Sequence, residues 1–184
     1  TYAEVYATIQ FDSQLKALFY EKMMFIETAV KNIALECILD KARSENIQDF
    51  FDRAVAGYKN APANVDEEGK KKLQKNKLAL QSMVQAYLSK AYSGGNPKIT
   101  HFYNNMSYND VPIWALVEIM TLGDFGFLLS CLTIDTREAI SRKIGINLSC
   151  DTNRELVYKY LYTLKDLRNA VAHNAVVFDT RYRK

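Results

Sequence analysis

Residues 14–43 carry the pattern that most restricts the fold of this chain. Apolar residues recur there at steps of three, four and seven, namely Leu15, Leu18, Phe19, Ile26, Val30, Ile33 and Cys37. This spacing predicts a long amphipathic helix. The chain has only 7 glycines and 3 prolines among its 184 residues, and an all-β sandwich of this size would need more turn residues. The sequence therefore predicts an all-α fold, arranged as one domain over residues 1–184.

A break at residues 93–97, with two glycines and a proline, separates the other predicted helices. Before it, we expect helices over residues 47–58 and 67–92, with a loop at residues 61–66 between them. Neither flank of the break looks able to fold alone, so we do not expect a domain boundary there. Short helices are expected after the break, the second of them running through Leu132.

Capping signals predict where the later helices begin and end. Asp110 is expected to cap a helix that carries a proline in its first turn and stops near Gly123. The patterns Asp135-x-x-Glu138 and Thr152-x-x-Glu155 resemble capping boxes that open the last two helices. We expect the first of these helices to end at Gly145 and the second near residue 173.

Cysteine content and charge bear on location and partners. The three cysteines, Cys37, Cys131 and Cys150, cannot all pair within the chain, and free thiols are typical of the cytoplasm. No run of about 18 apolar residues is present, which predicts no membrane span, and no signal peptide is recognisable. The net charge of +3 permits an anionic partner without requiring one. Scattered cysteines and two histidines give no reason to expect a metal or another cofactor.

Three tempting features have plainer explanations. Asp124-Phe125-Gly126 matches the metal-binding triplet of kinases, but no glycine-rich phosphate loop accompanies it. Gly123 and Gly126 match the G-x-x-G of KH domains, but the strands of that fold are missing. The lysines within residues 70–77 are more typical of a solvated helix face than of a phosphate-binding surface.

The last predicted helix has an apolar side and a polar side. At 100° per residue, its apolar stripe contains Leu156, Val157, Tyr160, Leu161, Leu164, Leu167 and Val171. The polar side contains Tyr162, Asp166, Asn169 and His173. Arg168 falls at the edge of the apolar stripe, where a guanidinium is unfavourable unless it is paired or directed at an anion.

Arg168 and His173 allow two interpretations. In the first, Arg168 pairs with a carboxylate such as Glu27 on the first long helix, and His173 is an ordinary surface residue. In the second, both contact a scissile phosphate, where arginine stabilises the growing negative charge and histidine moves a proton. Spacing alone favours the first, because arginine and histidine five positions apart are common by chance.

Several motifs resemble those of one family. The segment LKDLRNAVAH (Leu164–His173) resembles the R-N-x-x-A-H signature of the Abi-like abortive-infection proteins of the HEPN superfamily. Asp110–Gly123 is similar to that family's P-I-W-x-L-x-E block. Phe11-Asp12 with Leu15-Lys16 resembles its F-D-x-x-L-[RK] motif, and Ile26-Glu27 its I-E pair. The motifs keep the family's order over roughly residues 5–184. The segment that precedes F-D-x-x-L in full-length relatives is missing, which indicates a trimmed or shortened member.

The resemblance implies a HEPN-like helical bundle with additional helices and, in active members, metal-independent cleavage of RNA. It implies that the ribose 2′-OH attacks its own 3′-phosphate. His173 would act as general acid or base, Arg168 would stabilise the phosphorane, and Asn169 would orient His173 or the phosphate. A single-domain member would need a homodimer to bring two such motifs together. The expected function is an endoribonuclease toxin of an antiviral abortive-infection system.

Positive charge gathers towards the C-terminus. Seven basic and three acidic residues lie between Arg154 and Lys184. Arg181, Arg183 and Lys184, together with Asn174, are candidate RNA-binding residues, although a frayed, solvated tail explains these basic residues equally well. The A-H-N variant of the family's A-H-H form leaves open whether Asn174 replaces a second catalytic histidine.

Two rival functions remain open at this point. The same fold could bind RNA or a protein without cleaving, with the Arg–His pair in a structural role. A helical regulatory scaffold that binds no nucleic acid is the third hypothesis. Whether an antitoxin or a regulatory protein is a further partner is also open.

Overall fold

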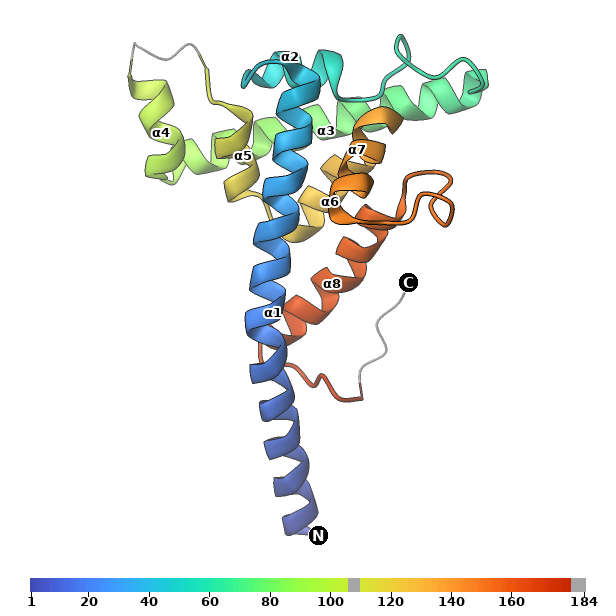
Figure 1. Cartoon of the computed structure of the whole chain (residues 1–184). Helices are drawn as coiled ribbons and strands as arrows, with labels where there is room; N and C mark the ends of the chain where they lie inside the picture. The colour runs from blue at the N-terminus through green and yellow to red at the C-terminus, as the bar shows by residue number, and fades with distance from the viewer. Residues whose placement is uncertain (106–109, 180–184) are drawn as a thin grey trace.

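A computed structural model describes residues 1–105 and 110–179. This part of the chain folds into eight α-helices without a named strand, which confirms the all-α prediction (Figure 1). The helices are α1 (Tyr2–Ala42), α2 (Ile47–Arg53), α3 (Glu67–Ser93), α4 (Pro97–Asn104), α5 (Ile113–Ile119), α6 (Leu122–Ser130), α7 (Ile134–Ile144) and α8 (Leu156–Ala172).

Helix α1 is a single helix of 41 residues that runs the length of the molecule. The other helices gather around its C-terminal half, and its N-terminal half projects from them (Figure 1). Its buried positions include Met23, Ala34 and Ile38. Leu18 and Ile26, which the predicted apolar stripe contains, are 63% and 36% exposed. The prediction is wrong for these two residues. Few elements cover the projecting part of α1 that carries Leu18, and Ile26, although it is next to Glu27, is on a less covered side of the helix.

Helix α2 ends at Arg53, several residues before the predicted end at residue 58. The residues that follow leave the helix and pair with the connection between α6 and α7. The N–H of Ala56 donates to the carbonyl of Cys131 at 2.8 Å, and the N–H of Thr133 donates to the carbonyl of Ala54 at 2.8 Å. These two hydrogen bonds satisfy backbone groups that a longer helix would have used.

The predicted caps of α5 and α7 differ from those in the structure. Pro112 occupies the N-cap position of α5, and the Asp110 carboxylate accepts instead from the N–H of Val111 at 2.7 Å. Helix α7 begins after Thr133 rather than at Asp135, because the hydrogen bond to Ala54 holds Thr133 in an extended conformation. The end of α7 at a glycine, residue 145 with φ 89°, is as predicted.

Asp151, rather than Thr152, caps the N-terminal end of α8. Its Oδ1 accepts from the N–H groups of Glu155 at 2.7 Å and Leu156 at 3.2 Å. The Asp151 side chain is buried and also accepts from the hydroxyl of Ser141. The predicted capping box is therefore wrong, because Thr152 is not the capping residue. The carboxylate of the preceding residue, Asp151, satisfies the first N–H groups of the helix instead.

Helices α6 and α8 pack closely because α6 presents two glycines to α8. A Cβ at Gly126 would lie 3.3 Å from Cε1 of Tyr162, and a Cβ at Gly123 would lie 2.8 Å from Cδ of Lys165. The G-x-x-G pattern therefore serves helix packing. Tyr162 packs against α6 and is not on a solvated side, whereas Tyr160 of the predicted apolar stripe is 56% exposed. These two assignments are wrong, because α8 is covered by α6 as well as by α1 (Figure 1).

The cysteines and the helix lengths bear on two further predictions. Cys37 and Cys131 are buried, Cys150 is exposed, and all three are free thiols, as expected. Within residues 1–105 and 110–179, no helix is sufficiently long and apolar to cross a membrane.

Candidate functional site

The candidate site lies where the C-terminal half of α8 packs beside α1. Arg168 on α8 faces Glu27 on α1, with 3.6 Å between the arginine Nε and the glutamate Oε2. This is an ion pair that is too long for a hydrogen bond, and neither atom has a hydrogen-bond partner in the described part of the chain. The Glu27 side chain is 12% exposed, and that of Arg168 is 37% exposed. The Arg168 side chain is therefore held near Glu27 on one side and is partly exposed to solvent.

Glu27 is shared between two cations. Lys31, one turn further along α1, places its Nζ 3.1 Å from the other carboxylate oxygen of Glu27. The same Nζ donates to the carbonyl of Met120 at 2.9 Å, which fixes the lysine. One negative charge thus faces two positive charges in a partly buried setting, so the local balance favours an additional anion.

A small pocket opens beside the Arg168 guanidinium. It has a volume of about 100 Å³ and is lined by Tyr20, Met23, Met24, Arg168, Val171 and Ala172. Such a volume corresponds to about three water molecules, so it can receive a group the size of a phosphate but not a whole nucleotide. Tyr20 is 56% exposed and Met24 38% exposed at its rim. This pocket of a single chain is therefore too small for a whole nucleotide.

His173 and Asn169 belong to the last turns of α8. The amide oxygen of Asn169 lies 3.5 Å from Nη1 of Arg168, which orients the guanidinium. His173 is the C-cap residue, and its N–H donates to the carbonyl of Asn169 at 2.9 Å. Its side chain is exposed. Residues five positions apart on a helix are separated by about 140° around it and about 7.5 Å along it, so Arg168 and His173 face different directions.

Asn174 ends α8 in a way that the sequence analysis missed. It adopts the left-handed conformation with φ 55°, which asparagine tolerates better than most residues. The N–H of Ala175 donates to the carbonyl of Ala170 at 2.8 Å, and that of Asn174 to Val171 at 3.4 Å. This is a Schellman motif. An asparagine directly after the last helical turn was the available signal.

The F-D-x-x-L-K motif of α1 holds the chain that follows α8. Oδ1 of Asp12 accepts from the N–H groups of Val177 at 2.8 Å and Phe178 at 3.0 Å. Nζ of Lys16 donates to Oδ1 of Asn174 at 2.8 Å and lies 2.6 Å from the Asp12 carboxylate. We call these five residues the C-terminal clasp. It determines the direction in which the chain leaves His173.

The clasp is partly buried and shifts the titration of its carboxylate. Val177 is 5% exposed and Asp12 6% exposed. The ammonium of Lys16 lowers the pKa of Asp12, and the backbone N–H groups of Val177 and Phe178 lower it further. The ionised carboxylate is thus the form that the clasp stabilises.

The predicted site residues are only partly brought together. Arg168, Asn169 and Glu27 lie in contact, His173 lies at the end of the same helix, and Asn174 turns its side chain to Lys16. Arg181, Arg183 and Lys184 lie outside the described residues. Among the residues that the structure does describe, no group of three or more histidine, cysteine, aspartate or glutamate side chains could hold a metal ion.

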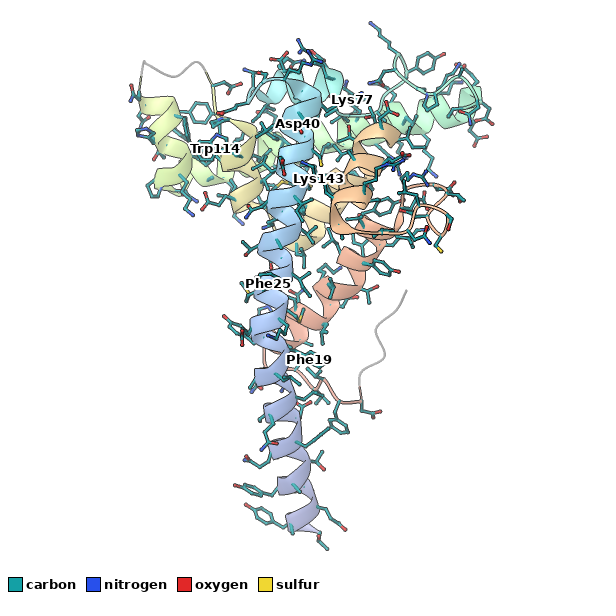
Figure 2. All side chains as sticks on the ribbon, viewed as in Figure 1. Phe19, Phe25, Asp40, Lys77, Trp114 and Lys143 are labelled. Carbon is teal, nitrogen blue, oxygen red and sulfur yellow. The ribbon has the colours of Figure 1, made fainter. Side chains whose placement is uncertain are left out.

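Other motifs of the sequence have structural roles. Asp124 of the D-F-G triplet lies in the first turn of α6, where its N–H donates at 3.2 Å to the hydroxyl of the N-cap residue Thr121. That hydroxyl donates in turn to the Asp124 carboxylate at 2.7 Å. In the lysine segment 70–77, Lys77 is half-buried and donates to the carbonyl of Phe51 at 2.6 Å (Figure 2). Lys71, by contrast, is exposed.

Comparison with known proteins identifies the family. The family model described as Abi-like protein matches residues 1–179, so the chain belongs to the Abi-like family, as its motifs predict. No curated protein and no solved structure matches the chain. Membership of this family suggests a role in abortive-infection defence.

Proposed function

We propose that this Abi-like protein is a metal-independent endoribonuclease of the HEPN type, acting as the toxin of an abortive-infection system. It cleaves RNA by attack of a ribose 2′-OH on the adjacent 3′-phosphate. Arg168 stabilises the negative charge of the phosphorane. His173 transfers the proton as general acid or base, and Asn169 keeps the guanidinium oriented towards the phosphate.

The observation that carries this proposal is the environment of Arg168. Its ion-pair partner Glu27 is already approached by Lys31 at 3.1 Å, and the Arg168 Nε makes no hydrogen bond among the described residues. A purely structural arginine would be expected to make short, paired hydrogen bonds to its carboxylate. Here the Arg168 side chain is 37% exposed and lines a pocket with the volume of a phosphate.

The directions of Arg168 and His173 support a site shared by two copies of the chain. The two side chains of one copy diverge around α8, and the pocket beside Arg168 is too small for a nucleotide. A twofold axis near the end of α8 would bring both Arg–His pairs to one phosphodiester. It would also cover Tyr20 and Met24, which are exposed at the rim of the pocket.

Cleavage of mixed RNA in the presence of EDTA tests the activity. The wild type should cleave RNA to products with 2′,3′-cyclic phosphate ends, and Arg168→Ala and His173→Ala should each lower the rate by roughly a hundredfold or more. The matched controls are Arg142→Ala, which removes a surface arginine of α7, and His101→Ala on α4, and both should remain active. Intact RNA in all five samples would contradict the proposal.

The second candidate is a HEPN-type module that binds RNA or a protein without cleaving. The observation that favours it is the Arg168–Glu27 ion pair itself, which gives the arginine a structural role. In that case all variants should bind RNA while none cleaves it. Sedimentation provides a further check, because a strict monomer at high concentration would contradict the shared site.

A further inference from the structure

A second cleft lies at the opposite end of α8 from His173. It has a volume of about 710 Å³ and lies among the C-terminal end of α1, α2, the loop before α3, the first turn of α7 and the residues just before α8. This volume is within the range typical of small-molecule sites. Three basic and three acidic residues line it, namely Lys41, Arg53, Arg137, Asp52, Asp135 and Glu155.

Two of these three cations are neutralised by neighbouring carboxylates. Nζ of Lys41 lies 3.4 Å from the Asp135 carboxylate. Arg53 lies 3.5 Å from Asp49 and also donates to the carbonyl of Ala42 at 3.0 Å. Neither side chain therefore needs a ligand to balance its charge.

Arg137 differs from the other two. In residues 1–105 and 110–179, no carboxylate lies within 4.0 Å of its guanidinium, and its buried Nε has no hydrogen-bond partner. The Glu155 carboxylate, which also lines the cleft, is held by Lys159 at 2.7 Å. A partly buried guanidinium without a partner is unfavourable, so Arg137 is suited to meet an anion that enters the cleft.

The uncharged side chains that line the cleft could contact a planar ring attached to an anion bound at Arg137. Ile134 is 40% exposed at the cleft and, together with Leu73 and Val65, provides an apolar surface. Asn64 and Asn153 also line the cleft, and neither amide is hydrogen-bonded to the described part of the chain. Amides beside an apolar surface can pair with the edge of a nucleobase or with ribose hydroxyls.

We propose that this cleft binds a free ribonucleoside monophosphate, with its phosphate on Arg137, its base against Ile134 and Leu73, and its polar edges on Asn64 and Asn153. A single unpaired cation matches a single phosphate group better than a di- or triphosphate. This site is separate from Arg168 and His173, and its occupancy does not depend on RNA cleavage.

Calorimetric titration with AMP, GMP, CMP and UMP tests the site. At least one of the four should bind, and inorganic phosphate should bind more weakly because it lacks the base. Arg137→Gln should weaken binding roughly tenfold or more. The matched control is Arg142→Gln, on the same helix but 65% exposed and paired with Glu138 at 2.7 Å, and its affinity should equal that of the wild type.

Further measurements separate the alternatives. The Ile134→Trp substitution, at an exposed position, should fill the cleft and abolish binding while the protein stays folded. It therefore tests the cleft even if Arg137→Gln fails to fold. No binding of any mononucleotide, or equal affinity in the wild type and both cleft variants, would overturn the proposal. A 5′-phosphorylated ribodinucleotide that binds at least as tightly as the mononucleotide would assign the cleft to an RNA end and also overturn it.

Discussion

The carboxylate of Asp12 accepts a hydrogen bond from the N–H of Val177 at 2.8 Å, across 165 residues of sequence. This bond fastens the chain beyond α8 to the first helix. Phe11 adds an edge-to-face contact with the ring of Phe178, with 6.3 Å between ring centroids. The first motif of the chain thus positions the segment that follows the proposed catalytic histidine.

Removing the Asp12 carboxylate should release this segment. In Asp12→Ala, the N–H groups of Val177 and Phe178 lose their acceptor, so their hydrogen exchange should become roughly tenfold faster or more. The same change should slow RNA cleavage, because His173 is no longer held. Glu21→Ala is the control on the same helix, since its side chain is 83% exposed. Unchanged exchange at Val177 would contradict the role of the clasp.

The clasp should also weaken in acid. The pKa of Asp12 is lowered from its ordinary 3.8 by Lys16 and by two backbone N–H groups. The contribution of this group to stability is therefore fully present above about pH 4 and is lost as the pH falls through the lower pKa of the folded state. NMR titration of the Val177 and Phe178 amides should report this loss below pH 3.8. An Asp12 carboxyl that titrates at or above 3.8 would contradict the sign of the shift.

Glu27→Gln should destabilise the protein. The substitution leaves Lys31 and Arg168 close together without the carboxylate between them, which we expect to lower the free energy of unfolding by roughly 1–3 kcal/mol. The control is Glu36→Gln on the same helix. Its partner Lys143, which Figure 2 labels, lies 2.6 Å away on a more exposed surface, so the loss of this pair should lower stability much less. Equal denaturation midpoints for both variants would show that Glu27 is not a structural partner of Arg168.

The glycines of α6 give a test of the packing behind α8. Gly126→Leu should lower the free energy of unfolding by about 1–3 kcal/mol, because its side chain would collide with the ring of Tyr162. Gly123→Ala should be tolerated, since its Cβ meets only the flexible end of Lys165. Urea denaturation compares the two variants. A fully stable Gly126→Leu protein would contradict the close approach of α6 and α8.

Periodicity predicted that the long helices exist, but not the full length of α1, which begins at Tyr2 rather than at residue 14. It also did not predict which of their faces are buried. The pattern in α1 predicted a helix, yet Leu18 is exposed and Ala34 fully buried. The cause is tertiary, since α1 contacts different neighbours along its length and has few over its N-terminal half. The spacing of apolar residues describes the helix as a whole. It does not show which part of the helix the neighbouring helices cover.

The candidate site was predictable as a set of residues but not as an arrangement. The motif pointed to Arg168 and His173, and helix geometry placed them on different sides of α8. The Lys31 contact with Glu27 could have been suspected from its i, i+4 spacing. The clasp could not, because a hydrogen bond between Asp12 and a backbone N–H near the C-terminus leaves no periodic trace in the sequence.

The most direct test of the shared site is a subunit-mixing experiment. Wild-type protein is equilibrated with a ninefold excess of His173→Ala, and cleavage is measured with RNA in excess over total protein. If two Arg–His pairs act on one phosphodiester, only about a tenth of the wild-type chains remain in fully wild-type dimers. The rate per wild-type chain should then fall to about a tenth of its unmixed value. A rate per wild-type chain that does not change on mixing would contradict the account.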